Sequence, residues 1–159
     1  MPDADTLAHY RTLVKDTTID GNTLLSTDYF NHFNEVIMLL SMLGDMPEML
    51  DEIRAWQPKT YKQHFEGSGL GFAALAIDAY DHVPPEYREP FDRVIAELEA
   101  TIAEAVVVLE AELGSPEVLG FMASDYWQRL QKLVDRGSAI VHGATEQATL
   151  DQDAIDALF

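Results

Sequence analysis

The chain has 159 residues, of which 47% are hydrophobic, so it is long enough to bury the core of one folded domain. Its 28 aspartates and glutamates outnumber 10 lysines and arginines, and the resulting net charge of −18 argues against nucleic acid or an anionic membrane as a partner. The sequence contains no cysteine, which excludes disulfides, zinc–thiolate sites and cysteine nucleophiles.

Targeting signals are also missing from the sequence pattern. Residues 1–5 are acidic where a secretory signal would be basic, and no apolar run follows them. The longest apolar stretch, residues 36–43, is too short to span a bilayer. A cytoplasmic protein is therefore expected.

Helical periodicity dominates the first half of the chain, and strand patterns are weak. The sequence predicts helices over residues 4–15, 28–43, 47–56, 60–66 and 72–82. Segments rich in glycine, proline and small polar residues separate them. Ser26 or Thr27 is expected to cap the second of these helices.

Two longer apolar series follow, and both alternate spacings of four and three residues. One series runs from Phe91 to Leu109 and the other from Leu119 to Ile140, with a turn predicted at residues 113–116. Such a period is typical of helices packed at a shallow angle. The predicted fold is all-α, a helical bundle built on a long antiparallel hairpin over 85–141 with shorter helices packed around it. A homodimeric four-helix arrangement is left open.

The helical pattern stops after residue 141. We predict a bundle domain over 1–141, a short linker over 142–148 and an acidic amphipathic peptide over 149–159. As a helix, this peptide would carry Ile155, Leu158 and Phe159 on one face. A helix this short is marginal alone, so it is predicted to become ordered when it docks in an apolar groove with lysines at its rim.

Residues 150–158, with the sequence Leu-Asp-Gln-Asp-Ala-Ile-Asp-Ala-Leu, resemble two known peptides that bind CheY. One belongs to the flagellar switch protein FliM, and the other ends the CheZ family of chemotaxis phosphatases. The resemblance implies a role in two-component signalling, with a CheY-like response regulator as the partner. The residues that it places in contact with the partner are Leu150, Asp151, Gln152, Asp153, Ile155, Asp156, Leu158 and Phe159.

The same resemblance implies a reaction, the hydrolysis of the receiver's aspartyl phosphate. The receiver would supply Mg²⁺, so the chain needs no cofactor of its own. Proteins of this kind present an acid and an amide on one exposed helix face; the acid engages a receiver lysine and the amide orients the attacking water. Candidates here are Asp28 with Asn31 and Glu35, and Asp125 with Gln128.

The chain departs from the CheZ pattern at the second candidate. An ungapped match would place the family's acid and amide on Gln128 and Lys132, which is the wrong chemistry, so a strict CheZ mechanism is not implied. Both pairs also fit ordinary solvated helix faces. The open alternatives are a non-catalytic adaptor or sink for a response regulator, and a structural helical protein whose tail packs on itself. Histidine spacing predicts no metal site, and His32 is a further, weaker candidate for phosphotransfer.

Overall fold

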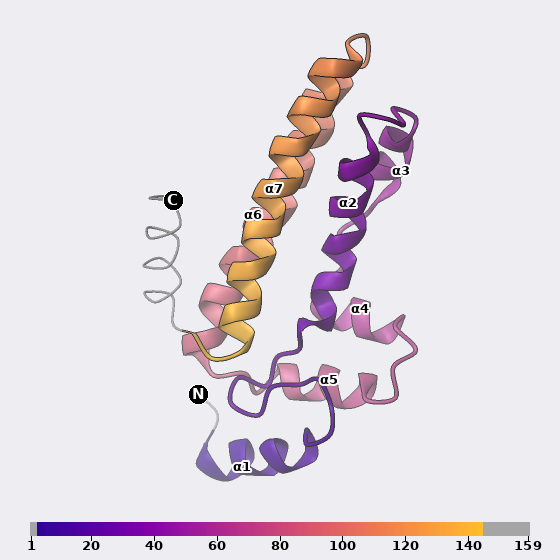
Figure 1. Ribbon diagram of the computed structural model, residues 1–159. Coiled ribbons are helices and arrows are strands. Elements are labelled where there is room, and N and C mark those ends of the chain that lie inside the picture. Colours follow the sequence, from indigo (N-terminus) through magenta and orange to yellow (C-terminus); the bar gives the residue numbers. More distant parts are fainter. Residues whose placement is uncertain (1–2, 145–159) are drawn as a thin grey trace. The chain divides into compact units, whose positions relative to one another are not determined.

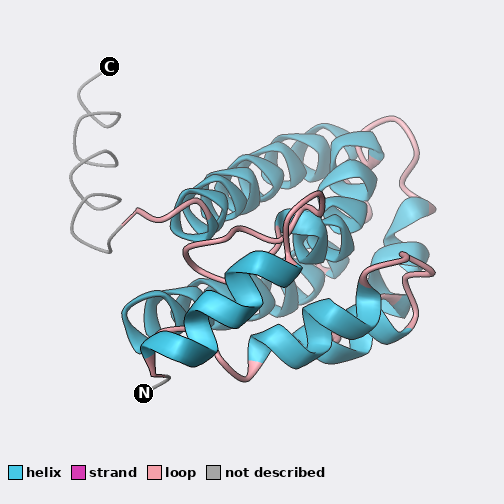
Figure 2. Ribbon diagram, turned by 90° about the horizontal axis from the view of Figure 1, so that it is seen from below, coloured by secondary structure: helices cyan, strands magenta, loops and turns pink. Residues whose placement is uncertain are grey.

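The structure is a computed structural model, and it describes residues 3–144 (Figure 1). Every regular element in this range is helical, apart from an isolated β-bridge between Ile19 and Ser26 (Figure 2). The predicted all-α class is therefore confirmed. The elements are α1 (Ala4–Leu13), the 3-10 turn η1 (Thr27–Phe30), α2 (Asn31–Met42), α3 (Met49–Ala55), α4 (Tyr61–Glu66), α5 (Ala73–Tyr80), α6 (Pro85–Glu110) and α7 (Pro116–Val141).

Local capping explains where several helices begin. The carboxylate of Asp3 accepts a hydrogen bond from the amide of Thr6 at 2.7 Å, which starts α1. Thr60 and Gln63 form a reciprocal capping box at the start of α4. The predicted helix over 28–43 begins instead as η1, where the Ser26 hydroxyl accepts from the amide of Asp28 at 3.2 Å.

The described residues form two compact units. Unit 1 comprises residues 3–29, 59–94 and 136–144, and unit 2 comprises Phe30–Pro58 and Ile95–Asp135. The long helices α6 and α7 each contribute residues to both units. Each unit has its own buried residues and is described by itself. None of the helices in residues 3–144 is both long enough and apolar enough to cross a bilayer.

Unit 1 is built around a cluster of aromatic side chains. The rings of Tyr61 and Tyr80 stack with centroids 4.3 Å apart, and Tyr61 also packs against Phe65 and Phe91. The Tyr61 hydroxyl accepts a hydrogen bond from the amide of Ser26 at 2.9 Å, which satisfies a buried backbone donor. The cluster therefore joins α4, α5 and α6 to the loop that precedes η1.

The tyrosines of this cluster predict an alkaline loss of stability. Burial raises the pKa of Tyr80 to about 12 and raises the pKa of Tyr61 further still. Since an unfolded tyrosine titrates near pH 10, the stabilisation is complete below about pH 10 and is lost as the pH rises through the folded pKa. Each group should lower the free energy of unfolding by roughly 1.4 kcal/mol per pH unit in this window.

Urea unfolding followed by circular dichroism between about pH 9 and pH 12 measures this slope. Tyr80→Phe removes one titrating phenol, so its slope should be shallower by one group. An identical slope in the variant and the parent protein would show that Tyr80 titrates in the same way when folded and unfolded.

Unit 2 contains α2 and α3 with the adjoining parts of α6 and α7. The ring of Trp56 stacks on the imidazole of His32 at 4.5 Å, and the Trp56 indole N–H donates to the His32 carbonyl at 2.9 Å. His32 is consequently buried, with 4% of its surface exposed. Helical spacing predicts that His32 shares the polar face of α2 with Asn31 and Glu35, but this prediction is wrong for His32, because Trp56 covers its ring after α3 ends.

A glycine pair brings two segments of unit 2 unusually close. A Cβ atom on Gly44 would lie 3.1 Å from the Cα of Gly120, and a Cβ on Gly120 would lie 3.2 Å from the Cα of Gly44. Both neighbours are backbone atoms, which cannot move aside as a flexible side chain can. The end of α2 thus lies against the start of α7 at a distance that only glycine permits without a shift.

Candidate functional site

The acid–amide pair of α7 lies open to solvent in unit 2. Asp125 and Gln128 are both exposed, and their spacing of three residues places them on the same side of the helix. The Gln128 amide nitrogen donates to the Ser124 hydroxyl at 2.9 Å. The side chain of Asp125 is 66% exposed, and its closest cation is Arg129 at 3.9 Å. A docking molecule could therefore reach the carboxylate and the amide together.

The opposite side of α7 is fixed against α6, and this contact determines which residues face outward. The Tyr126 hydroxyl donates to the Glu104 carboxylate at 2.9 Å, and Arg129 lies 3.5 Å from the same carboxylate. Burial and the hydrogen bond to Glu104 raise the pKa of Tyr126, so the phenol keeps the proton of this hydrogen bond to a higher pH than a free tyrosine would. With Tyr126 and Leu130 buried, Asp125 and Gln128 are held outward.

The contribution of Glu104 and Arg129 was not predicted. Arg129 also places its guanidinium 5.0 Å from the centre of the Tyr126 ring. The one signal in the sequence was the opposite charge of residues on two predicted neighbouring helices, which does not by itself identify a contact. These residues support the exposed face rather than belong to it.

The first candidate set is arranged differently. The carboxylate of Asp28 accepts hydrogen bonds from the hydroxyls of Thr18 and Ser26, so it stabilises the loop that precedes η1 in unit 1. Asn31 and Glu35 are exposed on α2 in unit 2, and the Asn31 side chain accepts from Asn34 at 3.5 Å. The boundary between the units falls after Tyr29, so Asp28 belongs to one unit and its proposed partners to the other.

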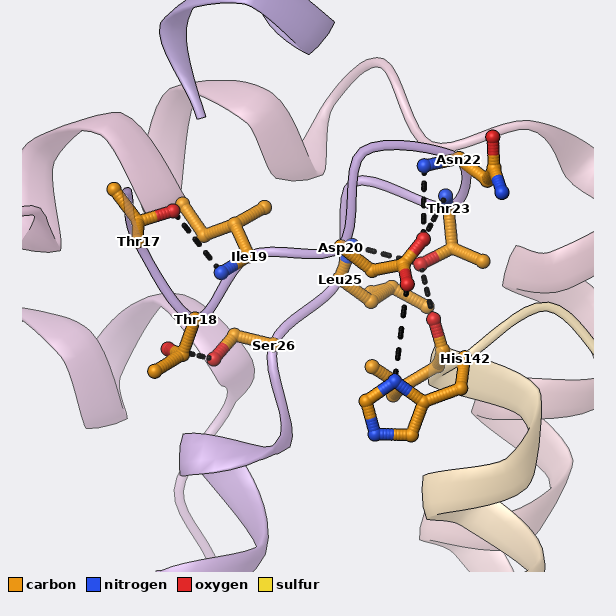
Figure 3. A network of polar contacts seen from close by, with 10 residues as sticks. Thr17, Thr18, Ile19, Asp20, Asn22, Thr23, Leu25, Ser26 and His142 are labelled. Atoms are coloured by element: carbon orange, nitrogen blue, oxygen red, sulfur yellow. Dashed lines mark hydrogen bonds and ion pairs between the residues drawn. The ribbon is translucent and has the colours of Figure 1, made fainter. Parts of the chain in front are cut away.

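The peptide over residues 149–159 lies outside the described residues, and so does most of the predicted linker. The last described residues follow the end of α7 in unit 1. Here a polar loop meets the helix terminus: the Thr23 hydroxyl donates to the Val141 carbonyl at 2.7 Å, and the His142 imidazole lies 3.7 Å from Asp20 (Figure 3). This contact fixes the end of α7, from which the chain continues to the peptide.

Asp20 stabilises the conformation of this loop through hydrogen bonds to its backbone. The Asp20 carboxylate accepts from the amides of Asn22 at 2.8 Å and Thr23 at 3.1 Å (Figure 3). Leu24 then adopts a left-handed backbone, with φ of 64°, while its side chain is fully buried. The composition of residues 20–22 indicated a turn, but no pattern indicated that the turn would bind the end of α7.

Across the described range 3–144, no group of three or more histidine, aspartate or glutamate side chains is placed to hold a metal ion. Unit 2 presents an exposed carboxylate and an exposed amide three residues apart on α7. No protein-family model matches the chain, and no curated protein or solved structure gives a match either.

Proposed function

We propose that this protein binds a CheY-like response regulator through residues 150–159 and uses Asp125 and Gln128 to promote hydrolysis of the receiver's aspartyl phosphate. The observation that carries the proposal is the sequence of the peptide, with apolar Ile155, Leu158 and Phe159 at helical spacing among aspartates. Its resemblance to the CheY-binding peptides of FliM and CheZ supplies the partner.

Hydrolysis of the receiver's aspartyl phosphate would require only a few contributions from this protein. In the hydrolysis, a water oxygen bonds to phosphorus while the bond between phosphorus and the aspartyl oxygen breaks, and the receiver's Mg²⁺ supports the charge on the phosphoryl group. The helper protein has to orient the water and engage the receiver. The Gln128 amide can accept a hydrogen bond from the water, and the Asp125 carboxylate can pair with a receiver lysine.

The exposure of the α7 pair supports its choice over the pair in the first candidate set. Asp125 and Gln128 can be approached without breaking a buried contact, and the Gln128 carbonyl oxygen can accept from water while its amide nitrogen donates to Ser124. Asp28 already accepts two hydroxyl hydrogen bonds in its own loop, so its use would cost those contacts.

A non-catalytic adaptor or sink is the second candidate. It is favoured by the spacing of the α7 pair, which is three residues where the CheZ family has four, and by Lys132 at the position of that family's amide. In this case the peptide would capture the regulator without changing its phosphate. Both candidates share the docking step, so the docking step is tested first.

Removal of residues 150–159 is expected to weaken binding to a receiver loaded with beryllofluoride by at least about 100-fold, because three apolar anchors are lost and each is worth about 1.5 kcal/mol or more when buried. Isothermal titration calorimetry with the full and truncated chains measures this. As a control, the two chains should give the same circular dichroism and the same thermal transition. Equal affinities would reject the proposed docking step.

A further inference from the structure

An exposed phenylalanine lies one helical turn before the acid–amide pair. Phe121 is 78% exposed, and Val118, three residues earlier on α7, is 44% exposed. Residues 118, 121, 125 and 128 are spaced by three, four and three, so they form one stripe along the outer face of α7 in unit 2. The first two residues of the stripe, Val118 and Phe121, are apolar. The last two, Asp125 and Gln128, are the candidate acid and amide.

The charges around this stripe indicate what could cover it. Between Glu104 and Asp125 the chain contains no lysine or arginine, and Glu117 precedes Val118 directly. Glu104 and Glu110 pair with Arg129 and Arg54 of other segments, and Asp125 lies 3.9 Å from Arg129, so the acidic character of the apolar end of the stripe comes from Glu112 and Glu117. A second copy of the chain would bring the same acidic surface and a net charge of −18, so its approach would be opposed. A matching surface has an apolar depression with lysines or arginines at its rim.

The peptide over 149–159 would be complementary to the same kind of surface, because it also combines apolar residues with aspartates. Both segments are thus complementary to an apolar surface with basic residues at its rim, and the simplest explanation is that one partner protein binds both. Binding at both would raise the effective concentration of the partner at α7.

We infer that Val118 and Phe121 form a second docking contact for the receiver, which places its phosphorylated face over Asp125 and Gln128. This inference rests on the proposed function. Phe121 acts here as a positioning residue: its ring enters an apolar depression of the receiver one turn, or roughly 5.4 Å, from Asp125. The peptide captures the receiver, and the α7 stripe orients it.

Phe121→Ala in the full chain tests the inference. Because the side chain is exposed, the variant should fold like the parent protein. It should weaken binding to the beryllofluoride-loaded receiver by about five- to tenfold, since part of an aromatic contact is lost. It should also raise the receiver concentration needed for half-maximal phosphate release while leaving the rate at saturation unchanged. Met38→Ala is the matched control, because Met38 is 57% exposed on α2 of the same unit and should alter neither value.

The outcomes separate this inference from the proposed function. If removal of 150–159 abolishes binding and Phe121→Ala changes nothing, the α7 contact is wrong and the docking peptide stands. If Phe121→Ala weakens binding while the truncation has no effect, the α7 contact stands and the docking peptide is wrong. If Phe121→Ala instead converts a dimer into a monomer in sedimentation, the stripe is covered by a second copy and the inference is overturned.

Discussion

Gln128→Ala is expected to reduce the acceleration of receiver phosphate release on the order of 100-fold, with little change in affinity for the receiver. The amide is proposed to act on the attacking water, so its contribution appears as the reaction proceeds rather than in docking. In the free protein its only described contact is the 2.9 Å hydrogen bond to Ser124, so its loss should not disturb unit 2. Single-turnover release from a phosphorylated receiver measures the rate.

Two neighbouring positions provide controls for this prediction. Gln131→Ala makes the same substitution on the same helix, but Gln131 donates to Asp135 at 3.0 Å and lies off the proposed stripe, so the release rate should stay at the parent value. Ser124→Ala leaves the amide in place and frees it from its hydrogen bond. If Gln128→Ala and Gln131→Ala release phosphate at the same rate as the parent protein, α7 has no catalytic role and the adaptor is the better description.

Gly120→Leu is expected to have the largest effect on stability, about 2–3 kcal/mol. A Cβ at this position would already be 3.2 Å from the Cα of Gly44, which is a backbone atom, so a side chain here forces the two segments apart. Leucine is a better helix former than glycine, so the loss arises from packing and not from helix propensity. Repulsion between the end of α2 and α7 would loosen unit 2.

Tryptophan fluorescence is a suitable probe, because Trp56 and Trp127 are the two tryptophans of the chain and both belong to unit 2. The urea midpoint should fall in Gly120→Leu. Gly114→Leu is the matched control: a Cβ there meets nothing within 4 Å, so its midpoint should change little. Equal midpoints for the two variants would show that α2 and α7 can separate at this point without cost.

The fold class was predictable because helical periodicity is a local property of the sequence. The spacing of residues that face inward on α7 also correctly placed Asp125 and Gln128 on the outer side, since Tyr126 and Leu130 are buried. Contacts between distant segments were not predictable. Trp56 covers His32 from a different element, and the close approach of Gly44 to Gly120 depends on how two helices pack.

The position of Asp28 illustrates the same limit within the candidate site. Its spacing to Asn31 fits an acid and an amide on one helix face, but the residue lies in a 3-10 turn and its carboxylate accepts from Thr18 and Ser26. Hydroxyl side chains in the preceding loop compete for that carboxylate, and helical spacing contains no information about them.

Binding of the C-terminal peptide to another protein underlies both proposed functions. A synthetic peptide of residues 149–159, titrated into an isotopically labelled CheY-like receiver, tests it by nuclear magnetic resonance. We expect saturable shifts confined to one groove, and we expect them to disappear when Ile155, Leu158 and Phe159 are all replaced by alanine. Absence of binding by the parent peptide, or equal binding by the alanine peptide, would contradict the claim.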